Sequence, residues 1–166
     1  MTTSGPLDGP TVVLGVGNPL LADDGAGLVL LERLRARRWP DPVPEFVDGG
    51  TWGMSLLPDI TAAARLLVLD AVRTGDPPGT VVRGEDDDVP RLYTRPASPH
   101  QVDLKEVLAA ATLLGQLPPV LVVVGVAPQQ TDDLHVGLTP AVEAALDRAE
   151  AEALRVLAAW GLRPQG

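Results

Sequence analysis

Two aspartates and one histidine have the side chains that could form a metal site in this chain. Asp24 follows an apolar run and a Gly/Asn/Pro turn, and Asp70 ends a second apolar run. His100 lies in the first turn of a predicted helix that Ser98 caps, with Gln101 as its capping-box partner. Two carboxylates and one imidazole form a mixed oxygen and nitrogen donor set, which suits a divalent transition metal with open coordination positions.

Each of these residues also has a structural interpretation. Asp24, or its neighbour Asp23, could cap the helix that follows the first loop. Asp70 follows four apolar residues, so we expect it to be partly buried and in need of a partner. A lone histidine in a first helical turn is usually structural, although the helix dipole favours the neutral imidazole that a metal requires. Spacing alone leaves both interpretations open.

Other kinds of site are excluded or disfavoured. The chain has no cysteine, so disulfides, thiolate metal sites and a cysteine nucleophile are excluded. The second histidine, His135, competes with His100 as a ligand, and the alternative is a plain loop histidine. Gly15 and Gly17 begin a pattern like a dinucleotide fingerprint, but Leu20 replaces its third glycine. No serine stands in a Gly-x-Ser-x-Gly elbow, which disfavours a serine hydrolase.

Strand and helix patterns alternate along the chain. Apolar runs predict strands at 11–16, 43–47, 65–72 and 120–126, with a short edge strand at 80–83 and a polar loop at 84–96. Helices are predicted from 25 onward, at 53–64, from 98 onward and from 139 onward. This order predicts one α/β domain over 1–166, with 1–10 as a flexible lead-in. We expect a three-layer sandwich, in which helices cover both faces of a twisted, mostly parallel sheet of about five strands.

The predicted topology brings the acidic residues together. Right-handed crossovers place the C-terminal ends of parallel strands along one edge of the sheet. Asp23, Asp24, Asp48 and Asp70 all follow apolar strand candidates. We therefore expect these residues at the edge where α/β folds bind their ligands.

Charge and composition argue against nucleic acids and membranes as partners of this protein. The formal net charge of -9 argues against a protein that follows a phosphate backbone. Residues 1–10 lack the basic and apolar parts of a signal peptide, and no apolar run is long enough to span a bilayer. We therefore expect a cytoplasmic protein, with no nucleic-acid partner and no membrane insertion.

Short motifs along the chain resemble those of a known family. The stretch 15–27, GVGNPLLADDGAG, resembles the opening motif of the nickel–iron hydrogenase maturation proteases. Similar motifs follow in the family's order at 48–51, 69–71, 98–101 and 137–140. The resemblance extends from Thr11 to Leu157, and an ordered set is far more specific than one motif.

The resemblance implies a fold, an activity and a site. The family's fold is an α/β sandwich around a largely parallel sheet. Its members remove a C-terminal extension from the precursor of the hydrogenase large subunit after nickel insertion. Asp24, Asp70 and His100 match the residues that contact this nickel, which the precursor supplies, and we predict that they are also catalytic. The first is often Glu in the family, so Asp24 reaches less far by one methylene. Neighbours of the site match three further residues: Asp23, Asp48 and Gly49.

The residues and the resemblance are compatible with three functions. A protease without a cysteine or serine nucleophile needs another way to activate water or polarise a carbonyl, and a metal can do both. We therefore predict a metal-dependent endopeptidase that acts on the hydrogenase precursor. The alternative is a non-hydrolytic, metal-dependent binding or chaperone module for the same precursor. A third function, hydrolysis of a substrate such as peptidyl-tRNA, is disfavoured by the acidic balance.

Overall fold

The structure, a computed structural model, describes residues 9–95 and 99–166, without the side chains of His100 and Val102. Most of the expected lead-in, and the expected cap Ser98, lie outside the described residues. Five strands form one sheet in the order β2-β1-β3-β5-β4. Their bounds are β1 Thr11–Val16, β2 Glu45–Gly50, β3 Arg65–Ala71, β4 Val81–Glu85 and β5 Val120–Val126. All neighbouring strands pair in parallel except β4, which is antiparallel to β5.

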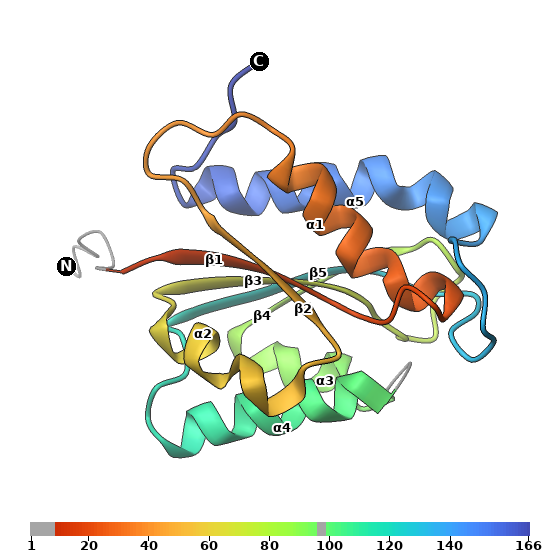
Figure 1. Cartoon of the computed structure of the whole chain (residues 1–166), viewed down its shortest axis with the longest axis horizontal. Coiled ribbons are helices and arrows are strands. Elements are labelled where there is room, and N and C mark those ends of the chain that lie inside the picture. Colours follow the sequence, from red (N-terminus) through yellow and green to blue (C-terminus); the bar gives the residue numbers. More distant parts are fainter. Residues whose placement is uncertain (1–8, 96–98) are drawn as a thin grey trace.

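Helices cover both faces of the sheet (Figure 1). On one face lie α1 Ala26–Arg35 and α5 Pro140–Ala159, and on the other lie α2 Leu57–Ala62, α3 Val89–Leu92 and α4 Pro99–Leu113. Short 3-10 turns precede three of the helices: η1 Ala22–Gly25, η2 Gly53–Leu56 and η3 Asp86–Asp88. The predicted three-layer α/β sandwich is confirmed. None of the described helices is long and apolar enough to cross a membrane.

The sheet separates two apolar clusters because side chains alternate along each strand. In β3, Leu67 and Leu69 join the cluster that includes residues of α1 and α5. Leu66 and Val68 join the cluster on the other face, with residues of α2 and α4. A strand covered on both faces is apolar at nearly every position, and this is why the nearly continuous apolar runs of β1, β3 and β5 predict their bounds so closely.

Two predicted segments need correction. The second strand begins at Glu45 rather than residue 43 and continues through Gly50, because Asp48 and Gly50 pair with β1 across a register shift. A side chain on Gly49 would be crowded there, since a Cβ would lie 2.8 Å from Leu14 Cδ1 and 3.0 Å from the Gly15 carbonyl oxygen. The expected loop at 84–96 contains η3 and α3. Burial of Val89 and Tyr93 against the sheet stabilises this short helix within an acidic stretch.

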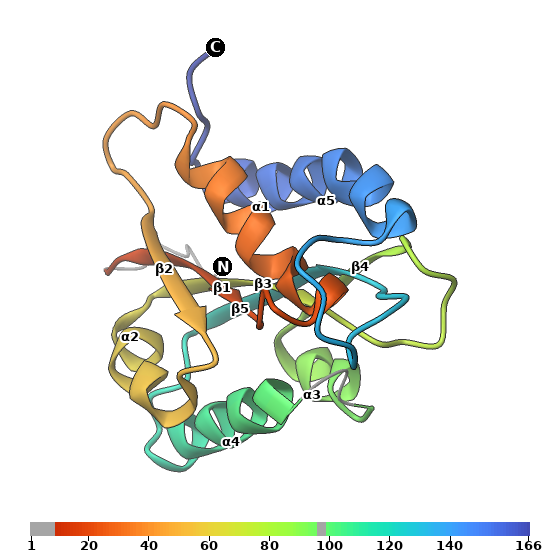
Figure 2. The same cartoon turned by 45° about the vertical axis from the view of Figure 1, so that its right-hand side comes forward.

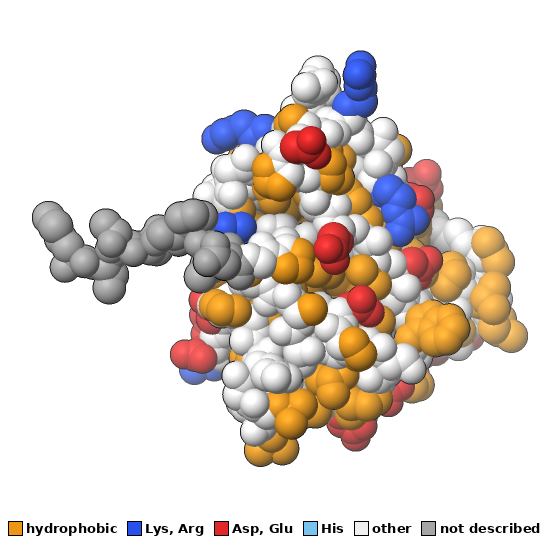
Figure 3. All heavy atoms as spheres, turned by 60° about the vertical axis from the view of Figure 1, so that its left-hand side comes forward, with side chains coloured by type: hydrophobic (Ala, Val, Ile, Leu, Met, Phe, Trp, Pro, Cys, Tyr) orange, Lys and Arg blue, Asp and Glu red, His pale blue; other side chains and the backbone are white. Residues whose placement is uncertain are grey.

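The parallel strands all end at one edge of the sheet, which comes forward in Figure 2. We call it the C-terminal edge. The segments that leave β1, β2 and β5 meet there. The first carries Asp23 and Asp24 and the last carries His135, whereas Asp70 lies near the end of β3 and His100 at the start of α4. On the face seen in Figure 3, turned the other way, acidic, basic and apolar side chains are interspersed.

Candidate functional site

Asp24 lies in the turn that follows β1. Its side chain is fully buried, and its Oδ2 accepts a hydrogen bond of 2.8 Å from the Asn18 backbone N–H. Asn18 Oδ1 in turn accepts one of 3.0 Å from the Leu20 N–H. The turn folds tightly onto η1, since a Cβ on Gly17 would lie 1.9 Å from the Asp24 carbonyl oxygen. The loop therefore holds Asp24 in one place from both its backbone and its carboxylate.

Neither Asp23 nor Asp24 caps the following helix, so that prediction is wrong. Gly25 is the N-cap residue of α1 and makes no side-chain capping hydrogen bond. The physical reason is η1, which places both aspartates inside a 3-10 turn before the helix begins. Their side chains therefore point to other parts of the fold.

Asp23 anchors the loop between β5 and α5. Its buried carboxylate accepts hydrogen bonds from the N–H groups of Gln129, Gln130 and Thr139, at 2.8–3.1 Å, and from the Thr139 hydroxyl. Thr139 is the N-cap residue of α5, so the carboxylate lies at the positive end of that helix dipole. One side chain thus joins both ends of the loop to η1.

Asp70 lies at the penultimate position of β3 and is fully buried. Its Oδ1 accepts a hydrogen bond of 2.8 Å from the Ala71 N–H. Its Oδ2 accepts one of 3.0 Å from Gln101 Nε2 and one of 3.3 Å from the Tyr93 hydroxyl. The Gln101 amide also donates to the Ala71 carbonyl oxygen. The burial of Asp70 and its need for partners were both expected, but Tyr93 was missed, although it is the only tyrosine in the chain.

The Tyr93 hydroxyl donates a hydrogen bond to Asp70 and stays protonated. Burial of the phenol, the negative charge of Asp70 and the hydrogen bond to Asp70 raise the pKa of Tyr93 well above its usual value. The neutral hydroxyl is therefore kept at physiological pH. Tyr93 and Gln101 together fix the orientation of the Asp70 carboxylate.

Tyr93→Phe should lower the free energy of unfolding by about 1 kcal/mol at neutral pH, because one buried acceptor loses a donor. The difference from wild type should shrink above about pH 10, where tyrosine ionises in the unfolded chain but not in the folded one. A raised pKa stabilises the fold below the unfolded-state value and loses that effect at higher pH. Denaturant titrations at neutral and alkaline pH measure this, and tyrosinate absorbance should appear only on unfolding. Tyrosinate formation at about pH 10 in the folded protein would contradict the burial of Tyr93.

His100 is the second residue of α4, as the sequence predicts. The adjacent Gln101 reaches Asp70, so the first turn of α4 lies beside the end of β3. The 3-10 turn that carries Asp24 also contacts β3. Among the side chains that the structure describes, no group of three potential ligands is placed to hold a metal ion. Because the His100 side chain is outside that set, the triad of Asp24, Asp70 and His100 stays a prediction.

The other two candidate residues, His135 and Asp48, are exposed rather than buried. His135 is exposed, while its backbone pairs with the first loop through His135 N–H to Leu20 O and Ala22 N–H to His135 O, at 2.9 and 2.8 Å. It therefore reaches the same edge without being buried beside the two carboxylates. Asp48 is exposed as well, and its Oδ1 accepts a hydrogen bond of 3.0 Å from the Gly50 N–H.

Comparison with known proteins adds evidence from sequence and structure. The profile of the family described as hydrogenase maturation protease, HycI, matches residues 29–156. The Hydrogenase 2 maturation protease of Escherichia coli K12 is 41% identical over 152 residues, which are 91% of this chain and 92% of that protein. The hydrogenase expression/formation protein HupD of Rhodobacter capsulatus is also 41% identical over 152 residues, which are 91% of this chain and 72% of that protein. The structure of the E. coli hydrogenase maturating endopeptidase HybD superposes with a TM-score of 0.87 and 40% identity, over 93% of this chain and 96% of that one.

Proposed function

Because the chain belongs to the hydrogenase maturation protease family and is a protease of that kind, we propose its reaction. It hydrolyses one peptide bond in the nickel-loaded precursor of a hydrogenase large subunit and releases the C-terminal extension. The nickel is part of the substrate. Asp24, Asp70 and His100 contact this nickel, and the protein thereby recognises a precursor into which the metal has been inserted.

The observation that supports this proposal is the convergence of the two carboxylates at the C-terminal edge. Asp24 comes from the loop after β1 and Asp70 from the end of β3, and both are fully buried. The first turn of α4, which carries His100, packs beside Asp70. Carboxylate and imidazole donors suit nickel, and a metal held by them would fix the position of the precursor. Placing the scissile bond in one geometry is itself a large part of catalysis.

Because the two carboxylates are buried, access to them requires a change at the C-terminal edge. Asp24 and Asp70 have no exposed surface, so a metal on another protein reaches them only when part of the C-terminal edge opens. We therefore propose that docking of the precursor precedes contact with its nickel. In the hydrolysis, the oxygen of a water molecule bonds to the carbonyl carbon and the C–N bond breaks. A proton from that water goes to the amine of the released extension, and the shortened subunit ends in a carboxylate.

The test is the intact mass of the precursor after incubation with the purified protein. We expect the nickel-loaded precursor to lose its C-terminal extension and the metal-free precursor to keep its full length. Recovery of both the shortened subunit and the released peptide identifies an endopeptidase. Stable binding of the nickel-loaded precursor without any change in mass would instead establish the non-hydrolytic chaperone module.

A further inference from the structure

Exposed apolar side chains gather at the C-terminal edge. Among the residues that the structure describes, eight large hydrophobic side chains are exposed, and five of them lie on the segments that follow β1, β2 and β5. We call these five the apolar rim: Leu20, Trp52, Met54, Leu134 and Val136. Three of them are more than two-thirds exposed: Leu134 at 82%, Val136 at 76% and Trp52 at 68%. Such a concentration on one side of a protein marks an interaction site.

The first part of the apolar rim is built by a short parallel bridge between Leu21 and His135. Three of the four residues next to the bridged pair are large and apolar, and their side chains are exposed. These three residues are Leu20, Leu134 and Val136. Two backbone hydrogen bonds hold the segments together, from His135 N–H to Leu20 O and from Ala22 N–H to His135 O.

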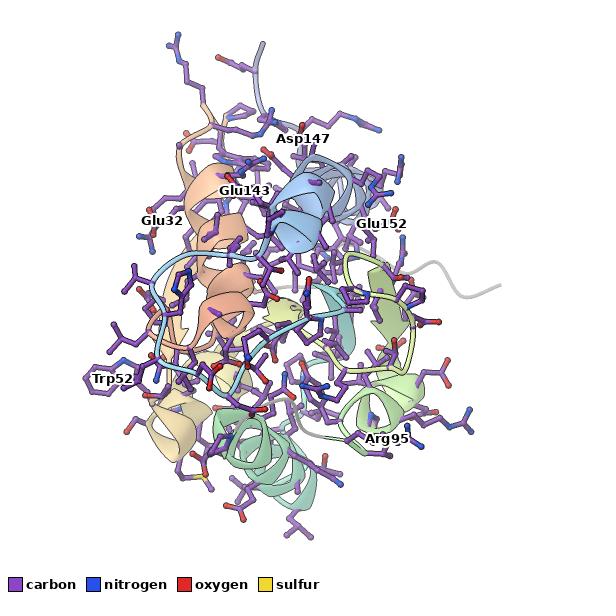
Figure 4. All side chains as sticks on the ribbon, turned by 90° about the vertical axis from the view of Figure 1, so that its right-hand side faces the viewer. Glu32, Trp52, Arg95, Glu143, Asp147 and Glu152 are labelled. Carbon is purple, nitrogen blue, oxygen red and sulfur yellow. The ribbon has the colours of Figure 1, made fainter. Side chains whose placement is uncertain are left out.

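The second part of the apolar rim follows β2. The Trp52 N–H donates to the Gly49 carbonyl oxygen, and Gly17 N–H donates to the Gly50 carbonyl oxygen, both at 2.9 Å. This segment is thus tied to the same loop that carries Leu20 and Asp24. Figure 4 faces the C-terminal edge and shows Trp52 projecting outward at its margin. Both parts of the apolar rim therefore border the loop that holds Asp24.

The charged residues on the segments that form the apolar rim are all acidic. The three segments 17–22, 48–54 and 129–138 contain three aspartates and neither lysine nor arginine. Asp48, Asp132 and Asp133 are all exposed. Arg73 donates to Thr131 Oγ1 at the start of the last segment, and Arg95 lies across the face from Trp52 (Figure 4). A partner with apolar side chains flanked by lysine or arginine would complement this surface.

We propose that the apolar rim binds the segment of the hydrogenase precursor around the scissile bond, through apolar side chains of that segment with basic residues beside them. The inference rests on the proposed function and adds where the precursor docks. Continuity with the Asp24 loop supports it, because a chain bound on Leu20, Leu134 and Val136 lies directly outside that loop. Binding there would bring the precursor to the edge before its nickel reaches the buried carboxylates.

The test uses exposed residues whose replacement leaves the core intact. The variants are Leu134→Ser combined with Val136→Ser, and Trp52→Ser alone. The matched control is Leu113→Ser combined with Leu114→Ser, since these side chains are also exposed but lie at the far end of α4. We expect the rim variants to raise KM for the nickel-loaded precursor about 10-fold or more and to keep kcat near wild type. The control should keep both values.

Charge gives an independent measurement of the same surface. Asp132→Asn combined with Asp133→Asn should weaken precursor binding and reduce its dependence on ionic strength, because fewer exposed charges are then screened. Wild-type affinity should fall as salt is added. The same dissociation constant and salt dependence in this variant would overturn the electrostatic part of the inference.

The outcomes separate the inference from the function on which it rests. If wild type never shortens the precursor, the proposed function fails, and the inference fails with it. If wild type shortens the precursor and the rim variants keep its KM, only the docking surface is wrong. Light scattering completes the test: rim variants that change self-association but not precursor binding would show that the apolar rim pairs two copies of this chain.

Discussion

Asp24→Asn and Asp70→Asn should each lower the rate of precursor trimming by about 100-fold or more. Asparagine keeps the size of the side chain and removes its negative charge, so the nickel of the precursor loses an anionic ligand while the packing is largely kept. Altering groups around a metal already costs about 10- to 100-fold in affinity or activity, and loss of a contacting carboxylate should cost at least as much. The measurement is the initial rate of release of the C-terminal peptide from nickel-loaded precursor.

Asp59→Asn is the matched control, because it changes net charge equally at an exposed position of α2. Circular dichroism and the unfolding midpoint must show that each variant folds. Asp70→Asn keeps an oxygen for Tyr93 and Gln101 but turns an amide toward the Ala71 N–H, so a stability loss of about 1 kcal/mol is expected. Trimming at the wild-type rate by folded Asp24→Asn and Asp70→Asn would disprove the assignment of the site.

Gly17→Ala should be the most destabilising of these single changes, by about 3 kcal/mol or more. Gly17 has a φ of 137°, and a Cβ there would lie 1.9 Å from the Asp24 carbonyl oxygen. Both the backbone conformation and the overlap oppose a side chain. To remove this overlap, the turn would have to move away from η1, which carries Asp24. The rate of precursor trimming should therefore fall together with the stability. Denaturant titration measures the change in free energy.

Gly137→Ala separates the two causes. Gly137 has a φ of 112°, and a Cβ there would have no atom within 4 Å. Its replacement should therefore cost only the backbone strain, about 1 kcal/mol. Equal losses in both variants would show that the turn tolerates the overlap and that the close approach of Gly17 to Asp24 is unimportant.

The sequence predicts the bounds of a strand best where both faces of that strand are buried. The strands at the centre of the sheet are covered on both faces, so every residue carries the apolar signal, and Thr11–Val16 and Val120–Val126 match their predictions at both ends. The second strand is at an edge of the sheet and ends in Asp-Gly-Gly, a sequence typical of turns. Pairing with β1 decides that local structure, and composition contains no information on pairing.

The site was predictable to the extent that topology controls it. The order of strands is enough to bring Asp24 and Asp70 to one edge. The partners of Asp70 could not be derived, because Tyr93 reaches it from a short helix hidden in an acidic segment. The role of Asp23 was equally inaccessible, since most of its donors are backbone N–H groups, which every residue but proline possesses.

The Asp23 hydrogen bonds have a consequence for the biosynthesis of the protein. Their donors lie 106, 107 and 116 residues further along the chain. Contacts of such sequence separation form slowly, because the entropy of closing the intervening chain opposes them. During translation, the full set of Asp23 hydrogen bonds therefore cannot form until Thr139 has left the ribosome. A chain that stops before residue 139 would lack these hydrogen bonds, so competence to process a precursor should require synthesis beyond that residue.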